Sequence, residues 1–384
     1  MRRPESDEER LDRLLSEAPT DARERARTEA DRRCGDRPLV LHGCGKTGRR
    51  LLAVLRADGR EPVAFSDNDS RKWGTECDGA PVMSPADAVA RFHSAAFIVS
   101  IWSAGAGYAA VERQFGDLGA PVVVPLQILL WRYSEEMLPF FLFTTPDRLL
   151  ERAGEISDAY RLWADDVSRR EYLGQLELRL TADYAALPVL SSAPQYFEPA
   201  IVSLSDHEVF VDCGAFDGDS MRTFLAQCGG RFEAIHAFEP DPGNFALLSA
   251  RHASLPEDQR LRIDVRNEAV SDRPGILRFD ATSGGDARAM ETGAITVPCV
   301  SLDDTIERAT YIKMDIEGAE ASALSGARRL VAESSPKLAV CLYHTPDGFF
   351  TLPSLMRRLC PDAAMHCRSY VVDGLDFVAY AVPR

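Results

Sequence analysis

A glycine-containing turn in the C-terminal half has residue types suited to ligand binding. The apolar run 209–213 contains Asp212 near its end and leads into Gly214 and Gly218. Glycine turns the chain, and lets its backbone approach a ligand, where a Cβ would clash. The amides from Gly218 to Ser220, at a predicted helix start, can hold a carboxylate or phosphate. Asp212 is placed to attract a cationic ammonium group.

A second acidic residue, Glu239, ends the next apolar run along the chain. An acidic side chain at this position accepts hydrogen bonds from a ribose 2′,3′-diol. The turn itself carries Asp212, Asp217 and Asp219. These carboxylates disfavour a pyrophosphate and suit a ligand with a sulfonium and an amino group. The pattern therefore favours S-adenosyl-L-methionine over NAD.

Charged residues alternate along 311–320, which predicts that Lys313, Asp315 and Glu317 point to one side of a strand. Such a row is unusual in a parallel strand, which is normally apolar on both faces. One interpretation is a buried lysine–carboxylate pair that orders the loop. The other places Asp315 beside a sulfonium and a methyl acceptor, oriented by Glu317 and Lys313. A hydroxyl acceptor would need a base to take its proton.

His344 follows the apolar run 338–343 and should lie at the same edge of the sheet. It is either a structural histidine or a residue that acts as a base or binds the acceptor. Asp315, Glu317 and His344 could together hold a divalent cation. Nothing in their spacing requires a metal, and we expect none.

The N-terminal half contains a second glycine motif, Gly43-x-Gly45-x-x-Gly48, between a predicted strand and a predicted helix. Asp67 ends the next predicted strand. This context is the one that a dinucleotide fingerprint needs. The motif indicates either a site for NAD, a nucleotide or a nucleotide sugar, or a scaffold that keeps its glycines for the turn and helix packing.

Alternating apolar runs and helical stretches predict the elements that position these residues. The expected strands are 38–41, 62–65, 95–102, 121–125, 209–211, 235–238, 262–265, 311–314, 338–343, 363–370 and 376–382. This rhythm is typical of βαβ units with a parallel sheet. The predicted fold is α/β, with two Rossmann-like parallel-sheet domains joined by helices. The expected parts are a charged helical tail (1–37), a Rossmann-like domain (38–125), a helical connector (126–194) and a C-terminal domain (195–384).

Local patterns predict more detail in two of these parts. The tail should be a solvated helix, a frayed segment or a docking arm for a partner. In the connector, Thr145 should cap a helix that has Pro146 at its first position.

Composition excludes several function classes. The 384 residues include 45% hydrophobic and 27% charged residues, which is ordinary for a globular protein of two or three domains. A formal net charge of −15 opposes binding to nucleic acid or anionic lipid. No apolar run is long enough to span a membrane, and no secretory signal is evident. We therefore expect a cytoplasmic protein, whose acidic tail and connector helices could support a homo-oligomer.

The chain from residue 195 resembles the FkbM-type family of class I S-adenosylmethionine-dependent methyltransferases. The matching segments, in order, are VFVDCGAFDGDS (209–220), AFEPDPGNF (237–245), RNEAVSD (266–272), VSLDD (300–304), YIKMDIEGAE (311–320) and YHTPDGFFTLPSLMRRL (343–359). The resemblance implies a seven-stranded sheet with the cofactor at the carboxyl edge of its first four strands. The N-terminal segment 38–125 loosely resembles nucleotide-sugar-binding Rossmann domains.

The resemblance also implies a role for each matching residue. Asp212, Gly214 and Gly218 would line the methionine end of the cofactor, and Ser220 would hold its carboxylate. The ribose would lie at Glu239 and Pro240, the adenine at Asn267, Glu268 and Ala269, and the reacting end beside Asp315.

The predicted function is methyl transfer from S-adenosyl-L-methionine, most consistent with a hydroxyl acceptor on a carbohydrate or secondary metabolite. The O-acceptor rests on the resemblance. The alternative is a sugar-modifying protein that uses NAD or a nucleotide sugar in its N-terminal domain. The sequence lacks the Tyr-x-x-x-Lys pair that would support hydride transfer there.

Overall fold

The computed structural model describes residues 5–103, 105, 107–279 and 295–384. Contacts divide the chain into two compact units. The first unit comprises residues 1–154, 170–190 and 371–375, and the second comprises residues 155–169, 191–370 and 376–384. The domain boundaries expected from the sequence stay a prediction. Within the described ranges, no helix is both long enough and apolar enough to cross a membrane.

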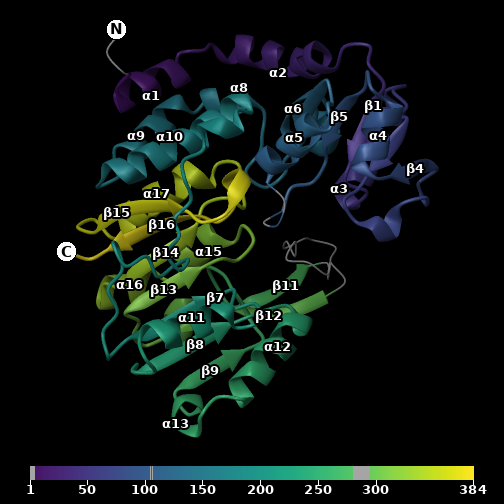
Figure 1. Cartoon of the computed structure of the whole chain (residues 1–384). Coiled ribbons are helices and arrows are strands. Elements are labelled where there is room, and N and C mark those ends of the chain that lie inside the picture. The colour runs from purple at the N-terminus through teal and green to yellow at the C-terminus, as the bar shows by residue number, and fades with distance from the viewer. Residues whose placement is uncertain (1–4, 104, 106, 280–294) are drawn as a thin grey trace. The chain divides into compact units, whose positions relative to one another are not determined.

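The first unit contains a six-stranded sheet (Figure 1). Its strands, in spatial order, are β3 (Glu76–Cys77), β4 (Ala80–Met83), β2 (Ala64–Ser66), β1 (Leu39–His42), β5 (Ala96–Val99) and β6 (Val122–Pro125). All neighbours are parallel except β3 and β4. The four predicted strands are present, whereas β3 and β4 were not predicted.

Short helices connect the strands of this sheet. They are α3 (Lys46–Ala57), the 3₁₀ helix η1 (Ser70–Lys72), α4 (Pro85–Arg91) and α5 (Tyr108–Asp117). The apolar face of α5, with Val111 and Phe115, packs on Phe97 and Val99 of β5. This packing fixes the loops at the carboxyl edge of the sheet, where the glycine motif lies.

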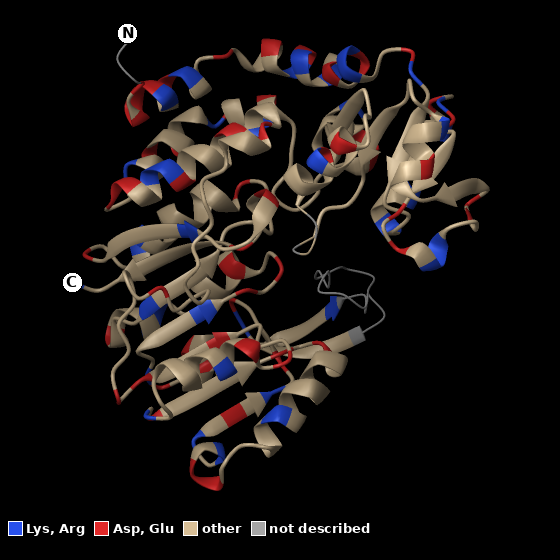
Figure 2. Ribbon diagram, viewed as in Figure 1, with Lys and Arg blue, Asp and Glu red and all other residues tan. Residues whose placement is uncertain are grey.

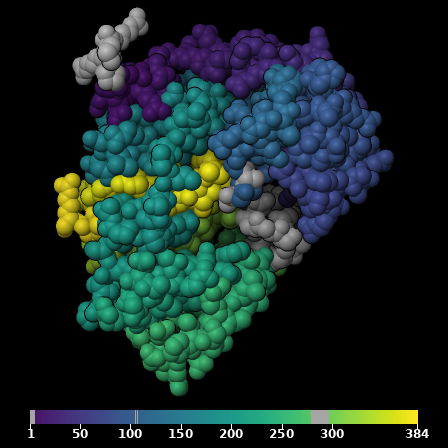
Figure 3. All heavy atoms as spheres, in the orientation of Figure 1, coloured from purple at the N-terminus to yellow at the C-terminus, as the bar shows by residue number. Residues whose placement is uncertain are grey.

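The N-terminal helices α1 (Asp7–Leu15) and α2 (Pro19–Cys34) carry interspersed acidic and basic residues (Figure 2). Each of these helices nevertheless buries one face against the rest of the first unit. Leu11 and Leu14 of α1 are buried, and α2 buries Ala22, Ala26 and Ala30 at four-residue spacing. This small-residue face lets α2 pack closely along α6 (Leu126–Arg132) and α8 (Pro146–Leu150) (Figure 3). The expectation of a solvated or frayed tail is wrong for these helices.

Further helices follow in the connector. They are α7 (Ser134–Met137), α9 (Ala153–Tyr160), α10 (Asp166–Thr181) and the 3₁₀ helix η2 (Tyr184–Ala186). The predicted helix at Pro146 is present as α8, but the Thr145 side chain makes no capping hydrogen bond. The boundaries between the two units fall inside α9 and inside α10.

The second unit contains the predicted seven-stranded sheet. Its strands, in spatial order, are β15 (Ala364–Ser369), β16 (Phe377–Val382), β14 (Lys337–Cys341), β13 (Tyr311–Met314), β7 (Val209–Cys213), β8 (Ala234–Phe238) and β9 (Ile263–Arg266). Only β16 runs antiparallel to its two neighbours. The α/β prediction with Rossmann-like parallel sheets is confirmed.

Helices and a small second sheet complete this unit. The helices are α11 (Asp219–Gln227), α12 (Pro242–Ala253), α13 (Glu257–Arg260), α14 (Leu302–Thr305), α15 (Glu320–Ser325), α16 (Arg328–Ser334) and α17 (Gly348–Leu359). The small sheet has the order β10 (Ala269–Val270), β12 (Ile295–Val300) and β11 (Gly275–Phe279) and was not predicted. The 3₁₀ helix η3 (Val372–Gly374) joins β15 to β16 and groups with the first unit.

Candidate functional site

The turn after β7 brings two loops of the second unit into close contact. Gly214 has φ +84°, and a Cβ there would lie 1.9 Å from the backbone oxygen of Asp315. Gly218 also has positive φ, at +86°, and is the N-cap of α11. Only glycine fits position 214 without moving the backbone after β13. The glycine turn and the backbone at Asp315 therefore pack against each other at the same edge of the sheet.

Beneath this turn lies a buried ion pair. Lys313 and Asp212 occupy paired positions on β13 and β7, and Lys313 Nζ lies 3.1 Å from Asp212 Oδ1. The two side chains are 2% and 0% exposed. Lys313 also donates to the carbonyl of Gly214, while Ser220 Oγ donates to Asp212 Oδ2. Burial opposes the charged lysine, but Asp212 and Asp315 outweigh it and raise the pKa of Lys313.

This geometry differs from two expectations. The cation beside Asp212 is the ammonium of Lys313, and Asp212 has no exposed surface for a ligand amino group. Ser220 Oγ is directed to Asp212, and the Ser220 amide donates to Asp219 Oδ1. The sequence missed this because the partner of Lys313 is set by the pairing of β7 with β13. For Lys313, the interpretation as a buried lysine–carboxylate pair is the one that the geometry supports.

Glu239 follows β8 at the same edge and joins two loops. Its Oε2 accepts from the amide of Phe216 in the glycine turn, and its Oε1 accepts from the amide of Asp241, both at 2.8 Å. Burial raises the pKa of Glu239, although these two amides oppose the change. A carboxylate has about four acceptor positions. The Asn244 side chain also lowers the pKa of Glu239 as a hydrogen-bond donor, so these three donors leave Glu239 capacity for a further hydroxyl donor.

The residues predicted to edge the adenine follow β9. Asn267 donates from Nδ2 to the carbonyls of Glu239 and Pro240, at 2.8 and 3.0 Å. Glu268 lies 3.8 Å from Arg266, and Ala269 is buried in β10. A pocket of about 400 Å³ is lined by Asp264, Arg266, Asn267, Glu268 and Pro298. The structure thus brings Asn267 and Glu268 to one hollow, next to the loop that carries Glu239.

Asp315 lies just beyond β13 and is 24% exposed. Its Oδ2 accepts from Tyr196 at 2.7 Å, and its Oδ1 accepts from Tyr343 at 3.4 Å. Burial favours the neutral acid, but the contact with His344 and the charge of Lys313 outweigh burial and lower the pKa of Asp315. Asp315 is therefore an ionised carboxylate at neutral pH.

His344 is held between two carboxylates. Its Nδ1 lies 2.7 Å from Glu320 Oε1, and its Nε2 lies 3.2 Å from Asp315 Oδ1. Burial opposes protonation, but Glu320 and Asp315 raise the pKa of His344 well above its ordinary value. Both ring nitrogens then carry protons. His344 is an imidazolium that orients Asp315, and in this state it cannot accept a proton.

The predicted alternation of charges does not extend through Glu317. Strand β13 ends at Met314, and Glu317 lies in a turn with φ +55°. Glu317 Oε2 still comes within 3.9 Å of His344 Nε2. The structure therefore brings Asp315, Glu317 and His344 together, but by the turn after the strand. Within the described ranges, no group of three or more His, Cys, Asp or Glu side chains is arranged to hold a metal ion.

Sequence reasoning gave Glu320 and Asp376 no role, and for Tyr196 it left open a lid or packing against the sheet. Tyr196 has φ +69° and contacts Asp315 from a segment far away in the sequence. Glu320 begins α15 and is 2% exposed. The charge of Asp376 acts on Tyr196, Cys341 and Tyr343. Distant segments bring Tyr196 and Asp376 to the site, and Glu320 reaches His344 through the turn after β13, so no local spacing reveals these contacts.

The sequence of this region matches a known family. Residues 212–366 match the methyltransferase FkbM domain. The resemblance expected from the motifs is confirmed over this range. A search of curated proteins found no match.

Solved structures support the fold of the chain. Methyltransferase FkbM from Methylobacillus flagellatus KT aligns with a TM-score of 0.75 at 22% identity, over 98% of this chain and 100% of that chain. UDP-D-quinovosamine 4-dehydrogenase from Vibrio fischeri aligns at 21% identity and a TM-score of 0.20, over 23% and 78%. Aeropyrum pernix fibrillarin with natively bound S-adenosyl-L-methionine aligns at 11% identity and a TM-score of 0.28, over 48% and 70%. Only the first alignment is close enough to show a shared fold.

Outside the matched residues 212–366, the three glycines of the N-terminal motif have different environments. Gly43 has φ +106°, and a Cβ there would lie 2.3 Å from Ile101. A Cβ on Gly48 would lie 2.0 Å from the carbonyl oxygen of Gly43. A Cβ on Gly45 would meet nothing within 4 Å. The first and third glycines are thus required by the turn and by packing, whereas the second faces open space.

Asp67 is bonded much as Glu239 is. Its Oδ2 accepts from the amide of Cys44 in the glycine turn and from Lys72 Nζ, at 2.9 and 2.8 Å, and its Oδ1 accepts from the amide of Asp69 at 2.9 Å. Burial opposes the charge, but Lys72 and the amides lower the pKa of Asp67. Asp67 is ionised and orders the turn.

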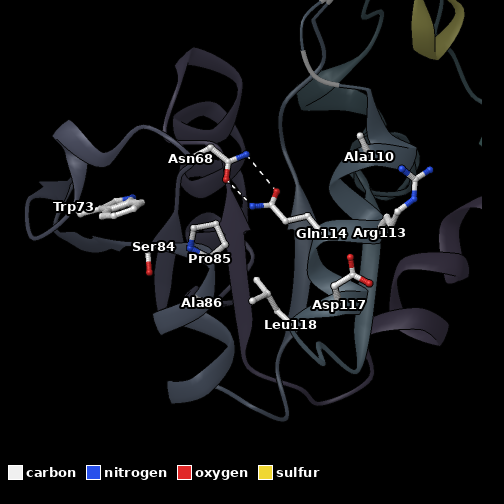
Figure 4. A pocket seen from close by; sticks show the side chains of 10 residues that line it. All are labelled: Asn68, Trp73, Ser84, Pro85, Ala86, Ala110, Arg113, Gln114, Asp117 and Leu118. Atoms are coloured by element: carbon white, nitrogen blue, oxygen red, sulfur yellow. Dashed lines mark hydrogen bonds between the residues drawn. The ribbon is translucent and has the colours of Figure 1, made fainter.

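A pocket of about 690 Å³ adjoins this region of the first unit (Figure 4). Asn68 and Gln114 join across it through two amide hydrogen bonds of 3.3 and 2.9 Å. Trp73, which is largely exposed, and Arg113 also line the pocket. Asn68, one of the residues that line the pocket, directly follows Asp67 in the chain. Trp73 gives the pocket an aromatic face, and Asn68 and Gln114 give it amide groups.

Proposed function

We propose that this protein transfers a methyl group from S-adenosyl-L-methionine to a hydroxyl group of a carbohydrate or secondary metabolite. The observation that carries the proposal is the placement of Glu239. It lies beside the glycine turn at the carboxyl edge of the sheet, with acceptor capacity left after its two backbone bonds. Open α/β sheets bind ligands at this edge.

The residues present fit the cofactor at its nucleoside end. Glu239 would accept bonds from the ribose hydroxyls, and Asn267 and Glu268, which line the adjoining pocket, would border the adenine together with the neighbouring Ala269. Asn267 fixes the Glu239–Pro240 backbone and so orients this site. Gly214 and Gly218 would let the backbone approach the methionine end. Asp212 would support this end from below through Lys313 and Ser220.

The cofactor supplies an activated sulfonium methyl group, so the chain has to align the acceptor and manage its proton. Alignment of reactants contributes up to about 7–11 kcal/mol. Asp315 is ionised and partly exposed, so its charge would favour the sulfonium and orient an acceptor hydroxyl. His344 and Tyr196 hold Asp315 in place, and Glu317 flanks His344. The hydroxyl acceptor itself is supported by the family resemblance.

Calorimetric titration with S-adenosyl-L-methionine tests the cofactor assignment. Glu239→Ala should weaken binding at least tenfold, because the ribose loses its acceptor and the glycine turn loses its anchor. Glu257→Ala, on the exposed face of α13, is the matched control and should bind like the wild type. Negligible binding by the wild type, or equal binding by wild type and Glu239→Ala, would refute the assignment.

A second candidate function concerns the first unit. We propose that it binds a nucleotide or nucleotide sugar, with the diphosphate on the turn at Gly45 and the base in the pocket beside Asn68. The open space at Gly45 favours this over a purely structural motif. Lys46 adds positive charge at the start of α3. Asp67 already has three donors, so a ribose would share this carboxylate with Lys72.

Gly45 allows a clean test of this second candidate. Gly45→Val should fold, because its φ is −97° and an added Cβ meets no atom within 4 Å, but it should fill the space that a diphosphate needs. Gly116→Val, also in open space in the first unit, is the control. UDP and NAD⁺ should raise the melting temperature of the wild type and of the control but not of Gly45→Val. No shift with either nucleotide would overturn the candidate.

A further inference from the structure

Asp376 lies at the edge of the sheet that carries Asp315 and His344. Strand β16 runs antiparallel to β14, with Cys341 paired to Val378. The amide of Leu342 donates to the carbonyl of Phe377 at 2.8 Å. Continuing this register places Asp376 beside Tyr343, where β14 ends. A residue that precedes β16 thus reaches the carboxyl edge of β13 and β14.

The backbone at Asp376 is held in an uncommon conformation. Its φ is +46°, in the left-handed region that residues with a side chain rarely adopt. The preceding residues, 371–375, group with the first unit. There Asp373 accepts the amide of Tyr108 at 2.7 Å, and its carbonyl accepts from Trp102. Local strain of this kind at Asp376 is common at functional positions.

The groups around Asp376 and Asp315 shift the pKa values of these two carboxyl groups in opposite directions. Burial raises the pKa of Asp376 to about 6, and the charge of Asp315 adds to this. Tyr343 and His344, which follow β14, and Lys313 on β13 act in the opposite direction. The pKa of Asp315 is lowered by contrast. Two neighbouring carboxyl groups with pKa values pushed apart are typical of separate roles in acid–base chemistry.

Four neighbouring groups at this edge, Asp315, His344, Tyr196 and Tyr343, are poorly suited to accept a proton near pH 7. Asp315 has a lowered pKa and is a weak base. His344 is already protonated between Glu320 and Asp315. Burial raises the pKa of Tyr196 and of Tyr343 well above 10, so both hydroxyl groups keep their protons.

We propose that Asp376 is the general base that takes the proton from the acceptor hydroxyl, while Asp315 remains ionised and orients the acceptor. The proposal rests on the methyl transfer proposed above. A lone pair of the acceptor oxygen forms the new C–O bond, and the electron pair of the breaking C–S bond stays on sulfur. The hydroxyl proton passes to the Asp376 carboxylate and then to water. A general base that matches the working pH contributes about 10²–10⁴-fold in rate.

Asp376→Asn is a suitable probe because asparagine tolerates the left-handed conformation better than most residues. Single-turnover methyl transfer should slow about 10²–10⁴-fold, while the Kd for S-adenosyl-L-methionine and the acceptor KM change less than twofold. The wild-type rate should fall below about pH 6, and this acidic limb should be absent in the variant. Asp373→Asn has a loop carboxyl whose pKa burial also raises to about 6, and it should keep the limb.

A measurement on the cofactor-free protein separates this proposal from the proposed function. Carbon-13 NMR of aspartate carboxyl groups should show two groups that titrate near pH 6, of which one disappears in Asp376→Asn and the other in Asp373→Asn. Unchanged turnover in Asp376→Asn, or loss of its cofactor binding, would overturn the base assignment. If the wild type fails to bind S-adenosyl-L-methionine while this carboxyl titrates as expected, the proposed function fails instead.

Discussion

Replacing Lys313 with methionine should strongly destabilise the second unit. The side chain is 2% exposed, and its ammonium lies 3.1 Å from Asp212, which is 0% exposed. Methionine fills a similar volume but leaves the Asp212 carboxylate buried without its cation. Breaking a buried pair in this way costs about 3–5 kcal/mol. Replacing Asp212 with asparagine as well removes the stranded charge and should recover about 1–3 kcal/mol.

Urea unfolding followed by circular dichroism gives the free energies for this cycle. Lys72→Met is the matched control, because Lys72 lies 2.8 Å from Asp67 but is 39% exposed. An exposed pair of this kind contributes about 0–1 kcal/mol. A loss below about 1 kcal/mol for Lys313→Met would refute the assignment of a buried pair. So would a double variant that is no more stable than Lys313→Met alone.

Three further outcomes are expected. Gly214→Ala should lower the free energy of unfolding by more than about 1 kcal/mol, because its Cβ would strike the Asp315 carbonyl at 1.9 Å; an unchanged melting temperature would contradict this close approach. The contribution of His344 to the free energy of unfolding is complete below pH 6.5 and declines as the pH rises through its raised pKa. Urea unfolding should therefore show a larger loss of stability for His344→Gln at pH 6 than at pH 10. Equal losses at the two pH values would contradict a protonated His344. The pKa of Asp376 rises from 3.8 to about 6 on folding, so the folded state loses stability as the pH rises between these values. At pH 7.5, calorimetry should therefore show a higher melting temperature for Asp376→Asn than for the wild type, with a free energy of unfolding greater by up to about 3 kcal/mol. At pH 4 the variant should show no gain.

The sequence predicts most of the main strands because they are continuous apolar runs, whereas β9 and β15 also contain polar residues. All four strands expected at 38–125 and all seven expected after residue 208 are present. Among the strands that were missed, β3 and β10 have two residues each, whereas β11 and β12 pair antiparallel in the small sheet. Two residues carry no detectable periodicity. Their pairing depends on the neighbouring strand, which local sequence does not specify.

The sequence predicted the site residues that follow strand ends. It did not predict which residues of other elements contact them. Glu239 and His344 follow apolar runs, so their positions at the carboxyl edge could be read from the sequence. The partner of Lys313 is set by strand register, and Glu320 reaches His344 through the turn after β13. Asp376 comes from a strand that returns antiparallel to the sheet. Such contacts require the topology as well as the motif.

Each unit has an acidic residue that accepts backbone amides of a glycine turn. This shared arrangement affects how such a residue in a sequence is interpreted. Glu239 and Asp67 each accept the amide of a glycine turn and the amide two residues further along the chain. Either carboxylate would therefore be retained to order its turn, even without a ligand. The difference lies in the remaining acceptor capacity, because Asp67 also binds Lys72. The acid and the glycines together predict a turn, and ligand binding then depends on whether a cation already occupies the carboxylate.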